Sequence, residues 1–199
     1  MLMLAMTLAL TLTANMARAD DFDDAWVAYQ SGNYATALKL WKSLADQGDA
    51  SAQNNLGAMY ANGEGVRRNY KETVRWYRKA ADQGYAKAQY NLGVMYDKGE
   101  GVLQDFKEAV RWYRLAADQG HAQAQHNLGA MLTNGEGVTE DKKEAVKWYR
   151  LAADQGHAPA QHNLGFMYQF GEGVIADAKE AVKWYRLRQI RVLPKLRIT

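Results

Sequence analysis

The sequence predicts an all-α fold, a right-handed α/α solenoid of antiparallel helix hairpins with a 36-residue period. One observation behind this prediction is that the string Ala-Asp-Gln-Gly recurs, ending at Gly48, Gly84, Gly120 and Gly156. A second is that the units that follow it align without a gap, at 49–84, 85–120, 121–156 and an incomplete 157–187. A third is that each unit holds two helical patterns separated by a glycine-rich turn.

The first nineteen residues have the features of an export signal. An apolar run from Leu2 to Leu12 is followed by Ala17-Arg18-Ala19, a small-x-small cleavage pattern, and then by acidic residues. A membrane anchor is the alternative, but spanning a bilayer takes about 20 apolar residues, and this run is shorter and interrupted by threonines. The sequence therefore predicts a signal peptide over 1–19 and a periplasmic or secreted protein without stable membrane insertion after cleavage.

Within each unit we expect a pair of helices. In 86–98, small and apolar residues recur at spacings of three and four, which indicates an amphipathic helix. Gly-Glu-Gly-Val at 99–102 predicts a turn, since glycine adopts the left-handed dihedrals that end a helix. Asp105 then stands at the N-cap of a second helix over 107–119, whose Trp112 is expected to be buried against the neighbouring hairpin.

Both ends of the array depart from this pattern. Residues 20–48 form a shortened hairpin pattern without the Gly-Glu-Gly-Val turn, and we expect this segment to cap the N-terminal end. The fourth unit loses its pattern after Leu187, and the basic segment 188–199 is expected to be an irregular tail because Pro194 interrupts any continuous helix.

Charge and cysteine content narrow the function. The chain has no cysteine, which excludes a disulfide framework, a cysteine zinc site and a thiol nucleophile. The formal net charge is +3, but the excess of cations lies at Arg18 and in the last twelve residues, so the body over 20–187 is slightly acidic. A nucleic-acid binder would carry a basic stripe on that body, so no nucleic-acid partner is expected.

The recurring columns resemble a known family. The pattern A-x-A-Q-x-N-L-G-x-M-Y-x-x-G-x-G-V, followed by W-Y-x-x-A-A-x-Q-G, is similar to the Sel1-like repeat, a relative of the tetratricopeptide repeat with a longer turn between its helices. Residues 20–48 are more similar to a plain tetratricopeptide unit. The resemblance implies a bacterial, non-enzymatic scaffold or adaptor that binds a peptide or protein surface in a concave groove lined by the first helix of each hairpin.

Candidate contact residues are those that differ between the units. In the first helix they occupy unit positions 3, 6, 10 and 13, a spacing that places them on one face. The candidate partner-binding residues are Lys87, Tyr90, Val94, Asp97, Gln123, His126, Thr133, His162, Phe166 and Gln169. The alternative is that these positions vary because they are solvated and unconstrained. The aligned aromatic residues favour an interface.

The sequence carries no catalytic signature. No serine is followed by lysine at the third position, and no HExxH motif occurs, so we expect neither catalytic residues nor a small-molecule substrate. Some secreted cysteine-rich members of the family that the sequence resembles have been linked to β-lactam binding, so a secreted β-lactam-binding or β-lactamase-like enzyme is the alternative.

We expect no metal and no cofactor. The four histidines lie at His121, His126, His157 and His162, and two that are five residues apart do not share a helix face. His126 and His162 could stack across units, but no third ligand accompanies them. The glutamates flanked by glycines are interpreted as turn residues and not as a cation-binding ridge; they are Glu64, Glu100, Glu136 and Glu172.

Overall fold

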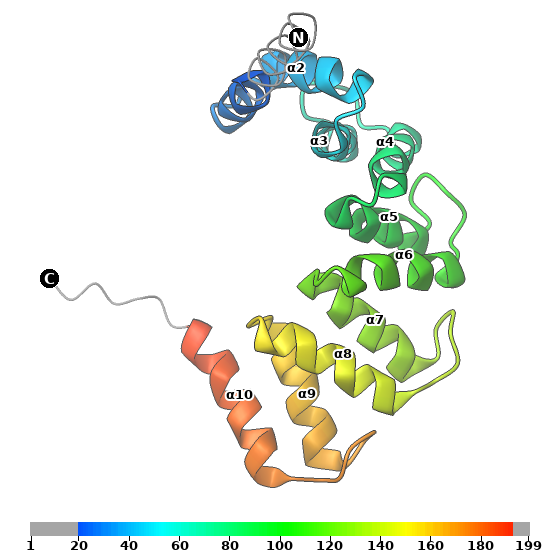
Figure 1. Ribbon diagram of the computed structural model, residues 1–199, viewed down its shortest axis with the longest axis vertical. Coiled ribbons are helices and arrows are strands. Elements are labelled where there is room, and N and C mark those ends of the chain that lie inside the picture. Colours follow the sequence, from blue (N-terminus) through cyan, green and yellow to red (C-terminus); the bar gives the residue numbers. More distant parts are fainter. Residues whose placement is uncertain (1–19, 193–199) are drawn as a thin grey trace, which may run out of the picture. The chain divides into compact units, whose positions relative to one another are not determined.

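The computed structural model describes residues 20–192, and side chains as far as Leu187 (Figure 1). The predicted signal peptide over 1–19 and residues 193–199 lie outside this range. Within it, the regular elements are helices joined by turns, arranged as sequential hairpins with a period of about 36 residues. The predicted all-α solenoid is confirmed. None of the helices between residues 20 and 192 combines the length and apolar composition that crossing a membrane requires.

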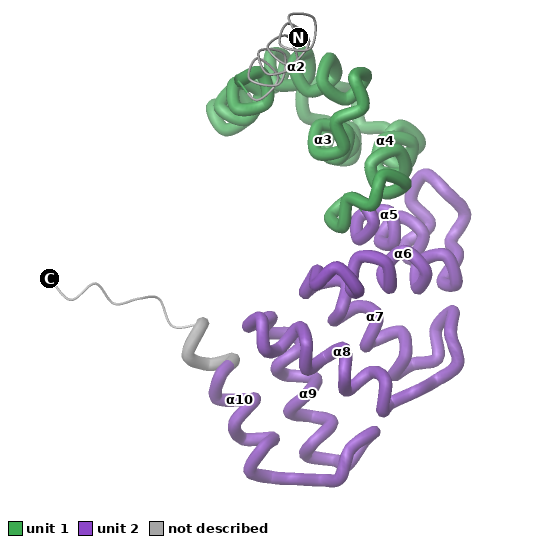
Figure 2. The backbone as a smooth tube through the Cα atoms, viewed as in Figure 1, with its two compact units in different colours: residues 1–88 green, residues 89–199 purple. Residues whose placement is uncertain are grey.

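The chain divides into two compact units, residues 1–88 and 89–199 (Figure 2). In the first unit, a helix over 20–30 precedes α2 (Tyr34–Asp46), α3 (Ala50–Asn62) and α4 (Tyr70–Asp82). Helix α3 packs against both α2 and α4. The core between them is built around Trp41, Leu56 and Trp76, each of which is almost completely buried.

Helix α5 (Ala86–Lys98) begins in the first unit and continues into the second. The second unit contains the further helices α6 (Phe106–Asp118), α7 (Ala122–Asn134), α8 (Lys142–Asp154), α9 (Ala158–Phe170) and α10 (Ala178–Val192). From α6 to α10, each helix packs against the next one in the sequence. Their shared core consists mainly of the recurring alanine, leucine, methionine and tyrosine positions.

The hairpin predicted from the second full unit agrees closely with the structure. Helix α5 has the expected bounds, and α6 begins and ends one residue earlier than expected. Asp105 caps α6, because its side-chain oxygen accepts from the backbone N–H groups of Lys107 and Glu108 at 2.9 and 3.0 Å. Trp112 is buried as predicted, with 3% of its surface exposed.

A glycine in the first helix of each hairpin lets the second helix approach closely. At Gly93, Gly129 and Gly165, an added Cβ would lie 2.7–2.8 Å from a tyrosine ring of the following helix. The rings belong to Tyr113, Tyr149 and Tyr185. No side chain fits in that space, so the glycine column of the repeat is explained by packing and not by a turn.

The glycine-rich turn within a hairpin packs against the preceding hairpin. Gly137 has a φ of +68°, and a Cβ there would lie 2.3 Å from the backbone of Phe106 at the start of α6. Gly173 lies in the same way against Lys142 at the start of α8. The second glycine of each of these turns therefore touches the second helix of the preceding hairpin, which only a residue without a side chain permits.

The C-terminal helix extends further than the sequence indicated. We expected an irregular tail from residue 188, but α10 is helical to Val192. Residues 188–192 depart from the repeat pattern but include no helix-breaking residue. Proline 194 is the first such residue, and it disfavours helical geometry only in its immediate neighbourhood.

Candidate functional site

The predicted partner-binding residues lie on α5, α7 and α9, and none is buried in the core. The side chains of five of them are exposed: Lys87, Gln123, His162, Phe166 and Gln169. The other five are half-buried: Tyr90, Val94, Asp97, His126 and Thr133. Lys87 belongs to the first compact unit and the others to the second. We call the nine residues in the second unit the A-helix stripe.

Two residues of the A-helix stripe are held by the hairpin that follows them. The ring of Tyr90 stacks on His121 with centroids 4.8 Å apart, and the ring of His126 lies 5.0 Å from that of His157. His126 Nε2 also lies 3.2 Å from the side chain of Asn163, in the middle of α9.

Three other residues of the stripe contact the tyrosine that covers the glycine of the same hairpin. The hydroxyl of Tyr113 donates to Asp97 at 3.2 Å, and that of Tyr185 donates to Gln169 at 2.9 Å. Thr133 lies 3.4 Å from the hydroxyl of Tyr149. Burial raises the pKa of Tyr113, so its hydroxyl remains a donor at neutral pH. The side chain at unit position 13 therefore helps to orient a tyrosine of the same hairpin, and that side chain itself remains partly exposed.

The structure adds Phe170 to the predicted set. Its ring lies 4.6 Å from that of Phe166, and the two side chains are 58% and 43% exposed. The sequence comparison considered unit positions 3, 6, 10 and 13, and it missed Phe170 because this residue occupies unit position 14. The sequence does distinguish Phe170, because the other three units have a polar residue at position 14: Asn62, Lys98 and Asn134. The two phenylalanines form an exposed aromatic pair at the end of α9.

The histidines pair with each other and with aromatic rings. Burial lowers the pKa of His126, and burial together with the nearby His126 and His121 lowers the pKa of His157. His121 acts as an N-cap, because its Nδ1 accepts from the backbone of Ala124 at 3.3 Å. In the part of the chain with described side chains, no group of three or more metal-ligating residues is placed to hold an ion.

Two of the turn glutamates interact with other parts of their own compact unit. Glu64 accepts a hydrogen bond from the hydroxyl of Tyr29 at 3.0 Å, and Glu172 pairs with Lys142 at 2.9 Å. The second contact links the last turn to the start of α8, beside the close approach of Gly173 to the same residue. These two carboxylates thus take part in contacts between successive hairpins.

Comparison with known proteins places this arrangement in a family. The Sel1 repeat profile matches residues 28–49, 50–85, 86–121, 122–157 and 158–187. A Sel1 repeat protein from Oxalobacter formigenes is 38% identical, with a TM-score of 0.81 over 86% of this chain and 68% of that one. A comparison with curated proteins found no match.

Two further solved structures extend the comparison. A protective antigen of uropathogenic Escherichia coli strains is 33% identical, with a TM-score of 0.83 over 89% of this chain and 39% of that one, so this chain spans well under half of the antigen. The immunity protein Pa5087 of Pseudomonas aeruginosa is 21% identical, covers 83% of this chain and 65% of its own, and shares the fold with a TM-score of 0.55. On the evidence of the five matched segments and the two relatives above 30% identity, the chain belongs to the Sel1 repeat family.

Proposed function

We propose that this protein is an exported, non-enzymatic scaffold that binds a peptide or a protein surface along the A-helix stripe of its second unit. The observation that carries the proposal is the exposed pair Phe166 and Phe170, which lies on the same helix as the exposed His162 and Gln169. Exposed aromatic side chains beside polar ones are typical of interface hot spots. Sel1 repeats are typical of protein-interaction adaptors, which supports a protein partner.

The half-buried part of the stripe gives that surface a fixed shape. Tyr90 and His126 are held by ring contacts, and Asp97 by a tyrosine hydroxyl, so their exposed atoms are already positioned before a partner arrives. Positioning of this kind lowers the entropy lost on binding. We therefore expect the partner to bind a surface that is rigid except at the exposed pair Phe166 and Phe170.

Site-specific photocrosslinking tests the surface. We expect a photoreactive phenylalanine at position 166 or 169 to crosslink a partner captured from the exported fraction, with identification by mass spectrometry. The matched controls are positions 103 and 175, because Leu103 and Ile175 are 91% and 90% exposed but lie outside the stripe. Equal crosslinking at all four positions would contradict the proposal.

Export is a separate part of the proposal, supported by the sequence pattern at the N-terminus. We expect N-terminal sequencing of the protein recovered from the periplasm or the medium to begin at Asp20. Recovery of the full-length chain from the cytoplasm alone would contradict export. The β-lactam alternative rests on resemblance, and nitrocefin turnover by the purified protein would favour it over a scaffold.

A further inference from the structure

The segment over 67–79, which contains most of α4, is much more basic than its counterparts in the other units. It holds six lysines and arginines and one glutamate, a formal charge of +5. The corresponding segments 103–115, 139–151 and 175–187 each have a formal charge of +1. Four positions account for the difference from the second full unit. They hold Arg67, Arg68, Asn69 and Lys79 in place of Leu103, Gln104, Asp105 and Leu115.

The structure places most of these cations on the exposed side of α4 and just before its first turn. Five of them are exposed: Arg67, Arg68, Lys71, Arg75 and Lys79. The last three lie at intervals of four residues, about 6 Å apart along the helix axis. Of the five, only Arg75 forms an ion pair within the described part of the chain, with Glu72 at 2.7 Å. We call these five residues the α4 basic face.

A buried tryptophan holds part of the α4 basic face in place. The cationic groups of Arg75 and Lys79 lie 4.4 and 4.5 Å from the centre of the Trp76 ring, which is 1% exposed. Lys42 of α2 reaches the same ring at 5.8 Å. A cation over an indole is attracted by the negative face of the ring. Three cationic groups are therefore drawn to one place despite their like charges.

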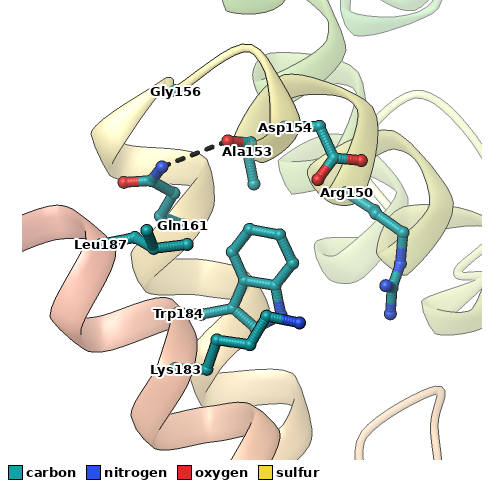
Figure 3. Close-up of a pocket in the computed structure, with 8 residues that line it drawn as sticks. All are labelled: Arg150, Ala153, Asp154, Gly156, Gln161, Lys183, Trp184 and Leu187. Atoms are coloured by element: carbon teal, nitrogen blue, oxygen red, sulfur yellow. Dashed lines mark hydrogen bonds between the residues drawn. The ribbon is translucent and has the colours of Figure 1, made fainter.

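The corresponding place in the last hairpin has one cation fewer (Figure 3). There, two cations lie near the Trp184 ring, Lys183 at 5.4 Å and Arg150 at 6.0 Å. Leu187 occupies the position that Lys79 has in the first full unit, and it lines a pocket beside Trp184. Packing around the tryptophan therefore does not require a lysine at this position.

Helix stability does not explain the α4 basic face. The N-terminal end of a helix carries a partial positive charge, which disfavours Arg67 and Arg68 and makes Asn69 a weaker choice than aspartate. Asn69 still caps the helix, since its side-chain oxygen accepts from the N–H groups of Lys71 at 3.1 Å and Glu72 at 3.2 Å. Like charges four residues apart on a helix also repel. A negatively charged ligand would account for this unfavourable pattern.

We propose that the α4 basic face binds an acidic segment of a partner protein in an extended conformation, with carboxylates at alternate positions. Alternate side chains of an extended chain lie on one side, about 6.4–6.8 Å apart. This spacing is close to the interval of about 6 Å between successive cations along α4. The face lies in the first compact unit and the A-helix stripe in the second, so neither proposal depends on the other.

The residues beside the cations favour a peptide over nucleic acid or lipid. Single-stranded nucleic acid binds where bases can stack on accessible aromatic rings, but Trp76 and Tyr77 of α4 are only 1% and 6% exposed. A helix that lies on an anionic membrane inserts large apolar side chains, and no such side chain of α4 is exposed. Carboxylates of an acidic peptide require only the exposed cations.

Peptide binding to the full chain, measured by fluorescence anisotropy, tests the proposal. The probe is a labelled peptide of about eight residues in which glutamate alternates with threonine, a residue that favours extended chains. We expect saturable binding that weakens as salt is added. A peptide of the same composition, with all its glutamates before its threonines, should bind more weakly. Equal affinity for the two peptides would overturn the proposal, as would the absence of saturable binding.

A neutralised variant uses residues that the repeat already accepts. Its four substitutions take the residues of the second full unit: Arg67→Leu, Arg68→Gln, Asn69→Asp and Lys79→Leu. Binding of the alternating peptide should weaken at least about tenfold, because several exposed ion pairs are lost. The converse substitutions, added to this variant, should restore binding on α6: Leu103→Arg, Gln104→Arg, Asp105→Asn and Leu115→Lys. Failure to restore it would show that these charges do not make the site.

A matched control separates the site from net charge. It removes four exposed cations from the second compact unit: Lys107→Gln, Lys143→Gln, Lys147→Gln and Lys179→Gln. This control has the same net charge as the neutralised variant and should bind the peptide like the wild type, since salt screens distant charges. Equal weakening in both variants would contradict a site on α4.

Two further probes test the class of ligand. Vesicles of equal parts phosphatidylcholine and phosphatidylglycerol, and a thymidine oligonucleotide, should bind more weakly than the alternating peptide at the same salt concentration. Tighter binding of either probe would overturn the peptide assignment. Dimers of the chain that the neutralised variant does not form would also overturn it, because a second copy would then occupy the face. None of these outcomes affects the crosslinking test at positions 166 and 169.

Discussion

Tyr90 and His126 show how a surface residue can also take part in packing. Each lies on the partly exposed face of a first helix, and the ring of each packs against the first residue of the next unit, His121 or His157. A substitution at either position would therefore change two properties, the exposed surface and the contact between hairpins. Phe166 has no such role in the core, since its ring partner Phe170 is itself exposed.

The neighbouring rings of His126 and His157 predict a pH dependence of stability. The folded-state pKa of both is lowered from 6.5, chiefly by burial, so the unfolded chain binds protons more readily. Stability is then fully present above pH 6.5, falls as the pH drops below it, and stops falling below the folded-state pKa values. Urea unfolding at about pH 8 and about pH 5.5 measures the change.

A matched variant isolates the contribution of the pair. Tyrosine occupies the same unit positions at Tyr90 and Tyr85, so the double variant His126→Tyr, His157→Tyr uses residues that the repeat already accepts. Tyrosine does not titrate in this range. The fall in stability on acidification should be smaller in the variant than in the wild type, and an equal fall would show that other groups cause it.

At the scale of the element, the turn glycines serve two different purposes. Gly120 and Gly137 both have a positive φ, +87° and +68°. Nothing lies within 4 Å of a Cβ added at Gly120, whereas a Cβ at Gly137 would lie 2.3 Å from the backbone of Phe106. The first glycine is required by conformation alone, and the second by conformation and by contact with the preceding hairpin.

This difference predicts unequal costs for the same substitution. Gly120→Ala should lower the free energy of unfolding by about 1–2 kcal/mol, the cost of placing an L-residue in the left-handed region. Gly137→Ala should cost about 2–5 kcal/mol, because overpacking adds about 1–3 kcal/mol to that conformational cost. Urea unfolding monitored by circular dichroism gives both values. Equal losses would mean that the turn moves away from α6 at little cost.

The starts of the helices also differ in how their backbone N–H groups are bonded. Asp105 and Asp141 hold the starts of α6 and α8 through side-chain bonds to backbone N–H groups. His157 occupies the same place before α9 but makes no such bond, and a proline follows within the first turn. Pro159 lacks an N–H, so one fewer backbone donor at the start of α9 needs a partner.

At the scale of the whole molecule, stability comes from contacts between adjacent hairpins. From α6 to α10 the helix pairs in close contact are consecutive in the sequence. Residues at corresponding positions of different units also make corresponding contacts, as Gln119 with Gln89 and Gln155 with Gln125 show. In a fold of this kind the free energy is approximately a sum of nearest-neighbour terms.

Deletion of one complete unit tests this view. Removing residues 121–156 joins Gly120 to His157, and His157 then replaces His121 beneath Tyr90 with the same ring. We expect the shortened chain to fold cooperatively, with unchanged helicity per residue and a urea m-value reduced in proportion to the surface removed. Loss of cooperative unfolding would show that the deleted unit supplies a contact its neighbours cannot replace.

The candidate surface was only partly predictable from the sequence. Column comparison found the face of α5, α7 and α9 that stays out of the core, because residues three and four apart share a helix face. It missed Phe170 and did not distinguish Tyr90, which stacks on the next hairpin, from the exposed Phe166. A pattern within one helix carries no information about side chains that arrive from another.

The sequence by itself determined the helix positions, the close packing at Trp112 and the solenoid fold, because these follow from local periodicity repeated four times. Only the tertiary structure decided which exposed positions are held and which polar groups lack partners. The contacts involved join Asp97 to Tyr113, Tyr90 to His121 and Gln125 to Gln155. Each depends on the distance between packed helices, a quantity set by the side chains between them and not by the pattern along either one.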